Sequence, residues 1–385
     1  MNGIYYYLIA FIAIWLVCLI FKDKLNKYGV ELNFPMIMFK TTRLEGIIEK
    51  IAKISPKFWR WFMNIGIVIS FLAMIFAAYT LIISLNTITT MPSVSLLLPG
   101  VEVPGSPIFI PFVSGIIALT LGLIVHEFSH GIYAKIAKIK IKSVGLFLLA
   151  ILPGAFVEPD DEKMNELTIL PKMRIFAAGS VANMSLAIIA ILSLIVISTV
   201  IIPANFHENG ILVSDVIVDS PADGYLKTGM VINSINGYTI HDSKTYLNFM
   251  YSIKPNQTLN ISTNQGDFTI ITSNNPTNID NGFIGITVSQ NMMVKDSIKA
   301  IWGKDIPWVW YCLADIAQWV FIINISIGLF NLLPIRGLDG GHLLRLLLEY
   351  KLPKSIVNPV MNLFSAIFIA IILFSLIFGL FGGII

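Results

Sequence analysis

Six long apolar runs restrict the fold of this chain more than any other feature of its sequence. About 20 apolar residues in a helix cross the hydrocarbon core of a bilayer. The composition agrees with such spans, because 56% of the 385 residues are hydrophobic and only 13% are charged. We therefore expect a polytopic α-helical membrane protein with about six transmembrane helices. The runs are roughly 4–21, 61–85, 108–130, 174–202, 306–333 and 359–383.

Lysine and arginine residues gather beside one set of helix ends. The stretches 22–60, 135–174 and 336–354 carry nine, seven and four of them, whereas 86–107 has none and 203–305 has six. The positive-inside rule then predicts cytoplasmic loops after the first, third and fifth helices, with both termini and the 203–305 segment outside the cell membrane. Because these cations lie beside helix ends and not among aromatic residues of a soluble face, nucleic acid is not an expected partner.

The first run has no basic residues before it and no small-residue cleavage pattern after it, so we expect a retained helix and not a signal peptide. Residues 41–60 alternate Ile and Leu with charged residues at helical spacing, which predicts an interfacial amphipathic helix. Residues 143–160 are apolar but interrupted by glycine and proline, so we expect extended or re-entrant chain against the bundle.

Three polar residues in the fifth run suggest either a substrate-facing or water-accessible side of this helix, or packing against other helices. They are Asp315, Gln318 and Asn324.

Residues 205–290 predict a small, mostly β domain inserted between the fourth and fifth helices. Short β-branched runs alternate there with turn signals rich in Gly, Asn, Asp and Pro. The order of elements, the triplet Ser220-Pro221-Ala222 and Gly229 resemble a PDZ domain of the type attached to proteases.

This resemblance implies peptide binding by strand addition, with a chain end held by one run of backbone amides. These amides belong to Gly210, Ile211 and Leu212. The alternative is a β insert that only shields the membrane core.

The third run ends in the motif His126-Glu127-Phe128-Ser129-His130. On a helix, residues four apart share a face, so His126 and His130 can offer two imidazole ligands to one metal ion while Glu127 serves as a general base. An ionisable cluster beside a membrane span is costly unless it has a function. The motif therefore predicts zinc proteolysis inside a membrane.

A catalytic zinc ion needs a third protein ligand. Asp339 follows the fifth run, and the charge distribution puts it on the same cytoplasmic side as the two histidines. Asp339 could instead begin a helix as its N-cap. His342, three residues further on, is a rival ligand that we rank lower.

Together, HEFSH and the pattern Asn331, Pro334, Leu338-Asp339-Gly340 resemble the site-2 protease family of intramembrane metalloproteases. The sequence Gly179-Ser180-Val181-Ala182-Asn183 is similar to a further motif of that family, and the resemblance covers roughly 108–350. It implies one zinc ion per chain, bound by His126, His130 and Asp339, with Glu127 as the base. It also implies that the 143–160 segment, including Gly154 and Phe156, holds an extended substrate together with Asn331. For both Asn183 and Asn331, packing between helices is the alternative to substrate contact.

The expected activity is hydrolysis of peptide bonds within or near transmembrane helices of membrane-protein substrates, as in regulated intramembrane proteolysis. One alternative is a membrane metal transporter or sensor that uses the same His/Asp site. It predicts repeated His, Asp or Glu residues in the first, second and sixth runs, which have none. A second alternative is a catalytically silent scaffold that presents the PDZ-like domain and tolerates loss of Glu127.

The sequence thus divides into five parts. We expect two N-terminal helices with a basic linker in 1–107, the first part of the catalytic core in 108–203, a PDZ-like domain in 204–291, the second part of the core in 292–350, and a C-terminal helix in 351–385.

Overall fold

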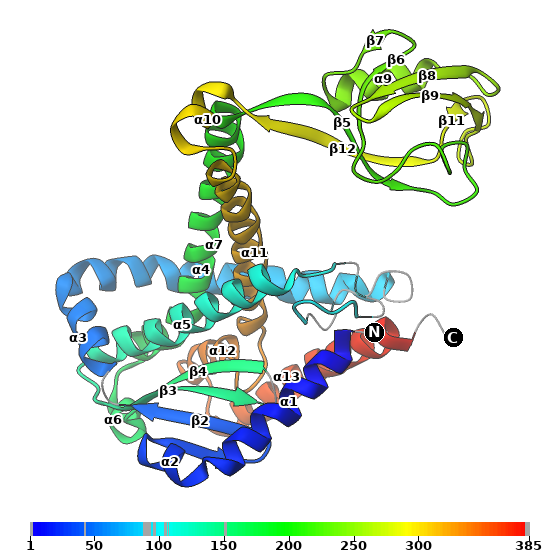
Figure 1. The fold of residues 1–385 in the computed structure, drawn as a ribbon. Coiled ribbons are helices and arrows are strands. Elements are labelled where there is room, and N and C mark those ends of the chain that lie inside the picture. The colour runs from blue at the N-terminus through cyan, green and yellow to red at the C-terminus, as the bar shows by residue number, and fades with distance from the viewer. Residues whose placement is uncertain are drawn as a thin grey trace. The chain divides into compact units, whose positions relative to one another are not determined.

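The computed structural model describes residues 3–41, 44–87, 94, 98–103, 106, 108–149 and 152–381. The chain forms two compact units (Figure 1). The first comprises Met1–Leu194 and Leu313–Ile385, and the second comprises Ile195–Cys312. Most of the expected 86–107 loop and residues 150–151 of the expected 143–160 segment lie outside the described residues.

The first unit is mainly helical. Five helices, counted with their short terminal turns, are long and apolar enough to cross a membrane: Pro56–Asn86, Phe112–Ile136, Ile169–Asn205, Ile306–Asn331 and Lys354–Leu380. The described part of the first run, Tyr7–Ile20, is a shorter apolar helix. The predicted class, a polytopic α-helical membrane protein with an inserted β unit, is thereby confirmed. The helices are α1 (Gly3–Ile20), α2 (Lys22–Lys27), α3 (Glu45–Ile54), α4 (Pro56–Ile83), η1 (Ser84–Asn86), α5 (Phe112–Ile136), α6 (Asp161–Glu166), α7 (Ile169–Val196), α11 (Val309–Asn331), α12 (Asp339–Glu349) and α13 (Lys354–Phe381).

A four-stranded antiparallel sheet accompanies these helices, in the order β1-β2-β3-β4. Its strands are β1 (Val30–Asn33), β2 (Met36–Thr41), β3 (Ile141–Leu149) and β4 (Leu152–Pro159). The hairpin β3–β4 is the extended segment expected over 143–160, with Val144 opposite Val157. Strands β1 and β2 lie in the stretch that the sequence indicated only as a basic linker. The amphipathic helix expected over 41–60 is the shorter α3, and Pro56 then begins α4, because proline fits the first turn of a helix.

The core of this unit gathers around α4, α5, α7 and α12. Met63 of α4, Tyr133 of α5, Ala177 of α7 and Leu343 of α12 are all buried in one apolar cluster. The cluster fixes the rotation of α5 and α7 about their axes. It therefore determines which side chains of these helices face one another.

The second unit is mostly β. Its main sheet is antiparallel, in the order β12-β5-β6-β8-β9, with β7 paired to β6. Strands β10 and β11 form a separate two-stranded sheet. Ile211, Ile232 and Ile261 lie fully buried in its core, and the Asp242 side chain caps α9 by accepting a hydrogen bond from Thr245 N at 2.6 Å. The elements are η2 (Ile197–Ile201), α8 (Ile202–Asn205), β5 (Phe206–Val216), β6 (Val231–Ile235), β7 (Tyr238–Thr239), α9 (Ser243–Ser252), β8 (Thr258–Thr263), β9 (Gly266–Ile271), β10 (Ser273–Asn274), β11 (Gly282–Phe283), β12 (Ile286–Val294), α10 (Asp296–Trp302) and η3 (Ile306–Trp308).

Candidate metal centre

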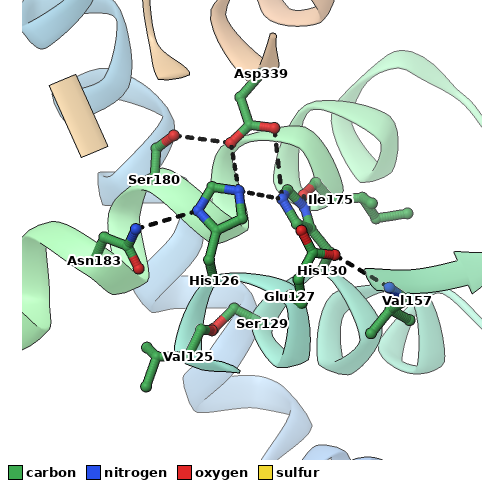
Figure 2. Close-up of polar contacts among 10 residues, drawn as sticks. All are labelled: Val125, His126, Glu127, Ser129, His130, Val157, Ile175, Ser180, Asn183 and Asp339. Atoms are coloured by element: carbon green, nitrogen blue, oxygen red, sulfur yellow. Dashed lines mark hydrogen bonds and ion pairs between the residues drawn. The ribbon is translucent and has the colours of Figure 1, made fainter. Parts of the chain in front are cut away.

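His126, His130 and Asp339 converge on one point (Figure 2). The two histidines lie one turn apart on α5, and their Nε2 atoms are 3.2 Å apart. Asp339, the first residue of α12, brings Oδ2 to 3.6 Å from His126 Nε2 and Oδ1 to 3.5 Å from His130 Nε2. A tetrahedral zinc ion with bonds of about 2.0–2.1 Å separates neighbouring ligand atoms by about 3.3–3.4 Å. The observed spacing therefore fits a shared zinc ion.

Two of the three ligand side chains are held in place by a second hydrogen bond. His130 Nδ1 donates to the carbonyl oxygen of Ile175 at 2.7 Å, so the Nε2 atom of the neutral ring carries a lone pair that faces the cluster. Ser180 Oγ donates to Asp339 Oδ2 at 2.8 Å. Both partners lie on α7, so this helix orients two of the three ligands.

Asn183, also on α7, faces the third ligand. Its side-chain Nδ2 atom lies 3.3 Å from His126 Nδ1, and the residue is fully buried. When the amide is turned by 180°, its oxygen accepts from Nδ1–H and Nε2 is free to bind a metal. This places Asn183 behind a ligand and agrees better with a positioning role than with substrate contact.

Gly179 lets α7 approach the histidines. A Cβ atom at this position would lie 2.4 Å from His130 Nε2 and 2.5 Å from His126 Nε2. Any other side chain would therefore occupy the place of the ligand atoms. The cluster of donors and the glycine beside it together form a cradle that matches a small cation.

Asp339 reaches the site because α12 packs closely on the turn before it. A Cβ atom at Gly340 would lie 2.0 Å from the carbonyl oxygen of Leu332, and one at Gly341 would lie 2.0 Å from that of Ile335. The Leu-Asp-Gly-Gly sequence is thus a packing requirement as well as a ligand motif. Asp339 does not act as an N-cap, because Leu338 holds that position and makes no capping bond through its side chain.

Glu127 lies beside the cluster and is not one of the three converging ligands. Its Oε2 atom accepts a hydrogen bond from the backbone amide of Val157 at 3.1 Å. This contact joins the carboxylate to β4 and leaves Oε1 available. Among the described residues, His126, His130 and Asp339 are the one group of three or more His, Cys, Asp or Glu side chains with ligand spacing.

The substrate residues expected on β4 have backbones that face away from Glu127. The Val157 amide points to Glu127, and strand alternation places the Ala155 amide on the same outer edge. Gly154 and Phe156 alternate with them and face β3, where they lie opposite Phe147 and Gly145. The ring of Phe147 covers Gly154, whose Cβ would meet it at 2.1 Å.

Four other expected positions lie apart from the cluster. Asn331 is the last residue of α11 and makes no side-chain hydrogen bond within the part of the chain that the structure describes. His342 stacks its ring on Phe176 at a centroid distance of 4.4 Å, and burial lowers its pKa. Asp315 accepts a hydrogen bond from Ser114 of α5, and Asn324 packs against α5, where its Nδ2 atom reaches the carbonyl oxygen of Ala118. These contacts of Asp315 and Asn324 favour helix packing as the reason for the polarity of α11.

The peptide groove expected at Gly210, Ile211 and Leu212 is not an open strand edge. These residues belong to β5, which pairs with β12 on one side and β6 on the other. The Gly210 amide donates to the carbonyl oxygen of His241 at 3.1 Å. Strand addition requires an unpaired edge. The edge strand beside β5 is β12, which follows Gly282-Phe283-Ile284-Gly285 in the sequence.

Residues 114–375 of this chain match peptidase family M50. An uncharacterized protein of Methanocaldococcus jannaschii is 31% identical over 345 residues, which cover 87% of this chain and 83% of that protein. A membrane-bound transcription factor site-2 protease homolog of Arabidopsis thaliana is 30% identical over 149 residues, which cover 39% of this chain and 28% of that protein.

Two solved structures are similar to part of the chain. The PDZ domain of the SdrC-like protein of Listeria monocytogenes is 26% identical with a TM-score of 0.19, and covers 21% of this chain and 87% of that chain. The PDZ domain of the SdrC-like protein of Listeria innocua is 25% identical with a TM-score of 0.20, and covers 22% of this chain and 97% of that chain.

Proposed function

The chain belongs to peptidase family M50, and we propose that it is a zinc-dependent intramembrane endopeptidase. Its membership confirms the resemblance to site-2 proteases that HEFSH and Leu338-Asp339-Gly340 indicate. Its substrates, in this proposal, are other membrane proteins, cut within or near their transmembrane helices in regulated intramembrane proteolysis. The observation that carries the proposal is the ligand spacing of His126, His130 and Asp339. The two histidines and Glu127 lie on α5, a helix of membrane-spanning type, and Asp339 begins α12.

A zinc ion in this cradle would polarise the scissile carbonyl and lower the pKa of a bound water molecule toward about 7. Glu127 accepts a proton from the water molecule that attacks the scissile carbonyl. The accepting atom is Oε1, because the Val157 amide holds Oε2 and fixes the direction of the carboxylate. Glu127 then returns the proton to the leaving amine. Asn183, Ser180 and the Ile175 carbonyl hold the three ligands in place.

The substrate binds as an extended strand along the outer edge of β4 in this proposal. A helical segment hides its carbonyls in its own hydrogen bonds, so it must unwind before cleavage. The Ala155 amide lies on the outer edge of β4 next to the Val157 amide, which is bonded to Glu127. Backbone pairing with this edge would hold a scissile bond close to the Glu127 carboxylate.

An apolar cavity between α5 and the four-stranded sheet that ends in β4 would accept a substrate side chain. It has a volume of 400 Å³ and is lined by Leu123 and Ile124 of α5, by Phe147, Pro153 and Gly154 of the hairpin, and by residues of α1, α2, β1 and β2. Its walls are almost entirely apolar. We therefore expect large aliphatic or aromatic side chains to be preferred beside the cleaved bond.

The proposal is tested with purified full-length protein in detergent and a single-span test substrate. Glu127→Gln should reduce the cleavage rate by about 10²–10⁴, the usual contribution of a general base. It should keep its zinc content, because Glu127 is not among the converging ligands. His126→Ala should lose both zinc and cleavage.

The matched control is Glu166→Gln, which changes the same functional group on the exposed face of α6. It should cleave as the wild type does. Cleavage by Glu127→Gln at the wild-type rate would contradict the proposed role of Glu127 as the general base. Loss of zinc in Glu127→Gln would instead make this residue a ligand.

We further propose that the β unit binds a peptide chain end between α9 and the segment before β12. A cavity of 230 Å³ lies there, lined by Tyr246, Leu247 and Met250 of α9 and by Phe283 and Gly285. Pairing with the free edge of β12 would supply backbone hydrogen bonds. A peptide with a free carboxylate should bind more tightly than its amidated form, and Met250→Asp should abolish binding. Equal binding of both peptides would contradict capture of a chain end.

The positive-inside rule supports an orientation with both termini and the β unit outside and the metal centre toward the cytoplasm. Protease accessibility of tags placed at each terminus, in sealed cells, tests it. Protection of both tags from external protease would contradict this orientation.

A further inference from the structure

Two adjoining cavities lie where α4 begins, α5 ends and α7 begins. The first has a volume of 440 Å³ and is lined by three cations, Arg60, Lys138 and Arg174, and by apolar or aromatic residues such as Tyr133 and Leu167. Among the described residues, no carboxylate lines it. The second has a volume of 430 Å³, shares Arg60 and Lys138 with the first, and adds further lysines. The two cavities therefore form one cationic groove on this unit.

The cations of the first cavity have no carboxylate partners. Within the part of the chain that the structure describes, neither Arg60, Lys138 nor Arg174 forms an ion pair. Arg174 instead donates from Nε to the side-chain oxygen of Asn64 at 2.9 Å, and it lies close enough to Arg60 for the two to repel each other. Like charges that gather without a counter-ion favour binding of an anion.

The second cavity differs in one respect, because it contains a carboxylate. Glu49 lines it, and this carboxylate already pairs with Lys53 at 2.5 Å. Lys135 pairs with Glu45 at 2.5 Å. The remaining cations, Arg60, Lys138 and Lys140, are thus not neutralised by these acids.

Aromatic residues place the groove at the level of lipid headgroups. Phe58 and Trp61, in the first two turns of α4, expose 48% and 59% of their surface. Trp59 between them donates its indole N–H to the carbonyl oxygen of Ile51 in α3 at 3.1 Å. Aromatic rings of this kind gather at the membrane–water interface. The groove also begins where three membrane-spanning helices have their ends.

We propose that this groove binds the phosphate headgroup of an anionic membrane lipid. Arg60 and Arg174 contact the phosphate, Lys138 closes the rim, and the acyl chains leave along the apolar walls near Tyr133 and Leu167. Basic pockets between transmembrane helices on the cytoplasmic side recognise such headgroups. The combination of unpaired cations with apolar walls suits an amphiphile better than a free anion.

Binding is measured on the purified full chain in a nonionic detergent by microscale thermophoresis, with dioctanoyl phosphatidylglycerol as the probe. Dioctanoyl phosphatidylcholine should bind at least about ten-fold more weakly, because its choline cation meets the arginines. The test variant combines Arg60→Gln with Lys138→Asn. Both side chains are exposed, and asparagine tolerates the positive φ of 64° at residue 138.

Each removed cation should weaken binding about five-fold, and the double variant therefore about 25-fold. The control is Lys22→Gln with Lys27→Gln, which removes two exposed cations from α2 outside the groove and should bind as the wild type does. Arg60→Lys, which keeps the charge, should retain most of the affinity. Equal affinity of the double variant and the wild type would overturn the site. Displacement of the lipid by inorganic phosphate at low millimolar concentration would overturn a lipid as the ligand.

Discussion

Replacing Gly179 by alanine should abolish zinc binding at the candidate metal centre while leaving the fold intact. The added Cβ would lie 2.4 Å from His130 Nε2 and 2.5 Å from His126 Nε2, whereas real Cβ contacts are essentially never shorter than 3.0 Å. Each ring nitrogen must then move by about 0.5–0.6 Å, beyond the tolerance of about 0.2 Å for metal–ligand distances. Neither ring can turn away freely, because His130 Nδ1 is bonded to Ile175 and His126 Nδ1 faces Asn183.

The expected size of the effect follows from this displacement. A misplacement of about 1 Å at a reacting centre lowers a rate about 10²-fold, so the cleavage rate of Gly179→Ala should fall at least ten-fold. Zinc content after purification should fall well below one ion per chain. Helix stability works in the other direction, because alanine in a helix interior is favoured over glycine by about 0.5–1 kcal/mol. Loss of zinc therefore cannot be attributed to a weaker α7.

The assay compares zinc content by elemental mass spectrometry, cleavage of a single-span test substrate, and the thermal unfolding midpoint. Gly46→Ala is the matched control, since Gly46 is also helical and has no atom within 4 Å of an added Cβ. The control should keep full zinc content and activity. Full zinc content in Gly179→Ala, with cleavage within two-fold of the wild type, would refute the placement of α7 against the histidines.

Three further predictions concern the same centre. Ser180→Ala removes the hydroxyl that donates to Asp339 and should weaken zinc binding about 10–100-fold in a chelator competition. Gly340→Ala puts a Cβ 2.0 Å from the carbonyl oxygen of Leu332, a backbone atom that cannot yield, and should lower the free energy of unfolding by about 1–3 kcal/mol in a denaturant titration. A strong chelator should abolish cleavage by the wild type, and added zinc should restore it; activity that survives complete removal of metal would contradict the assignment.

Local periodicity explains why much of the metal centre could be predicted from sequence. His126 and His130 share a face because the helix repeats every 3.6 residues, and this relation does not depend on the rest of the fold. The expectation that Asp339 lies on the same side as the histidines rested on the distribution of cations between loops, which is also a local property of the chain. Both predictions needed only the positions of the membrane-spanning segments and their order along the chain.

The contacts behind the ligands could not be predicted in the same way. Ser180 and the Ile175 carbonyl reach the site only because α7 has a particular rotation and approaches α5 closely. That rotation depends on packing against α4 and α12, including Met63 and Leu343. The one available signal was Gly179, since a glycine within a membrane helix often permits close helix contact.

Strand pairing accounts for the differences on the β side. Strands β1 and β2 are four and six residues long, and β2 pairs with β3, which begins 100 residues after β2 ends, so no local pattern distinguishes them from a linker. In the β unit, the first strand in sequence is β5, and it lies inside the sheet because the last strand, β12, pairs beside it. An apolar strand that follows a glycine looks the same in sequence whether it is interior or at an edge.

Strands β4 and β12 each lie at the edge of a sheet. An unpaired strand edge exposes amide and carbonyl groups, which is unfavourable near lipid and promotes association elsewhere. At β4 the Val157 amide is satisfied by the Glu127 carboxylate, so the edge is held beside the base. A substrate strand that pairs with this edge gains hydrogen bonds in an apolar setting, where they are stronger than in water. In the proposed mechanism, that gain would offset part of the cost of unwinding a transmembrane helix, and the same edge would bring the exposed carbonyls to His126, His130 and Asp339.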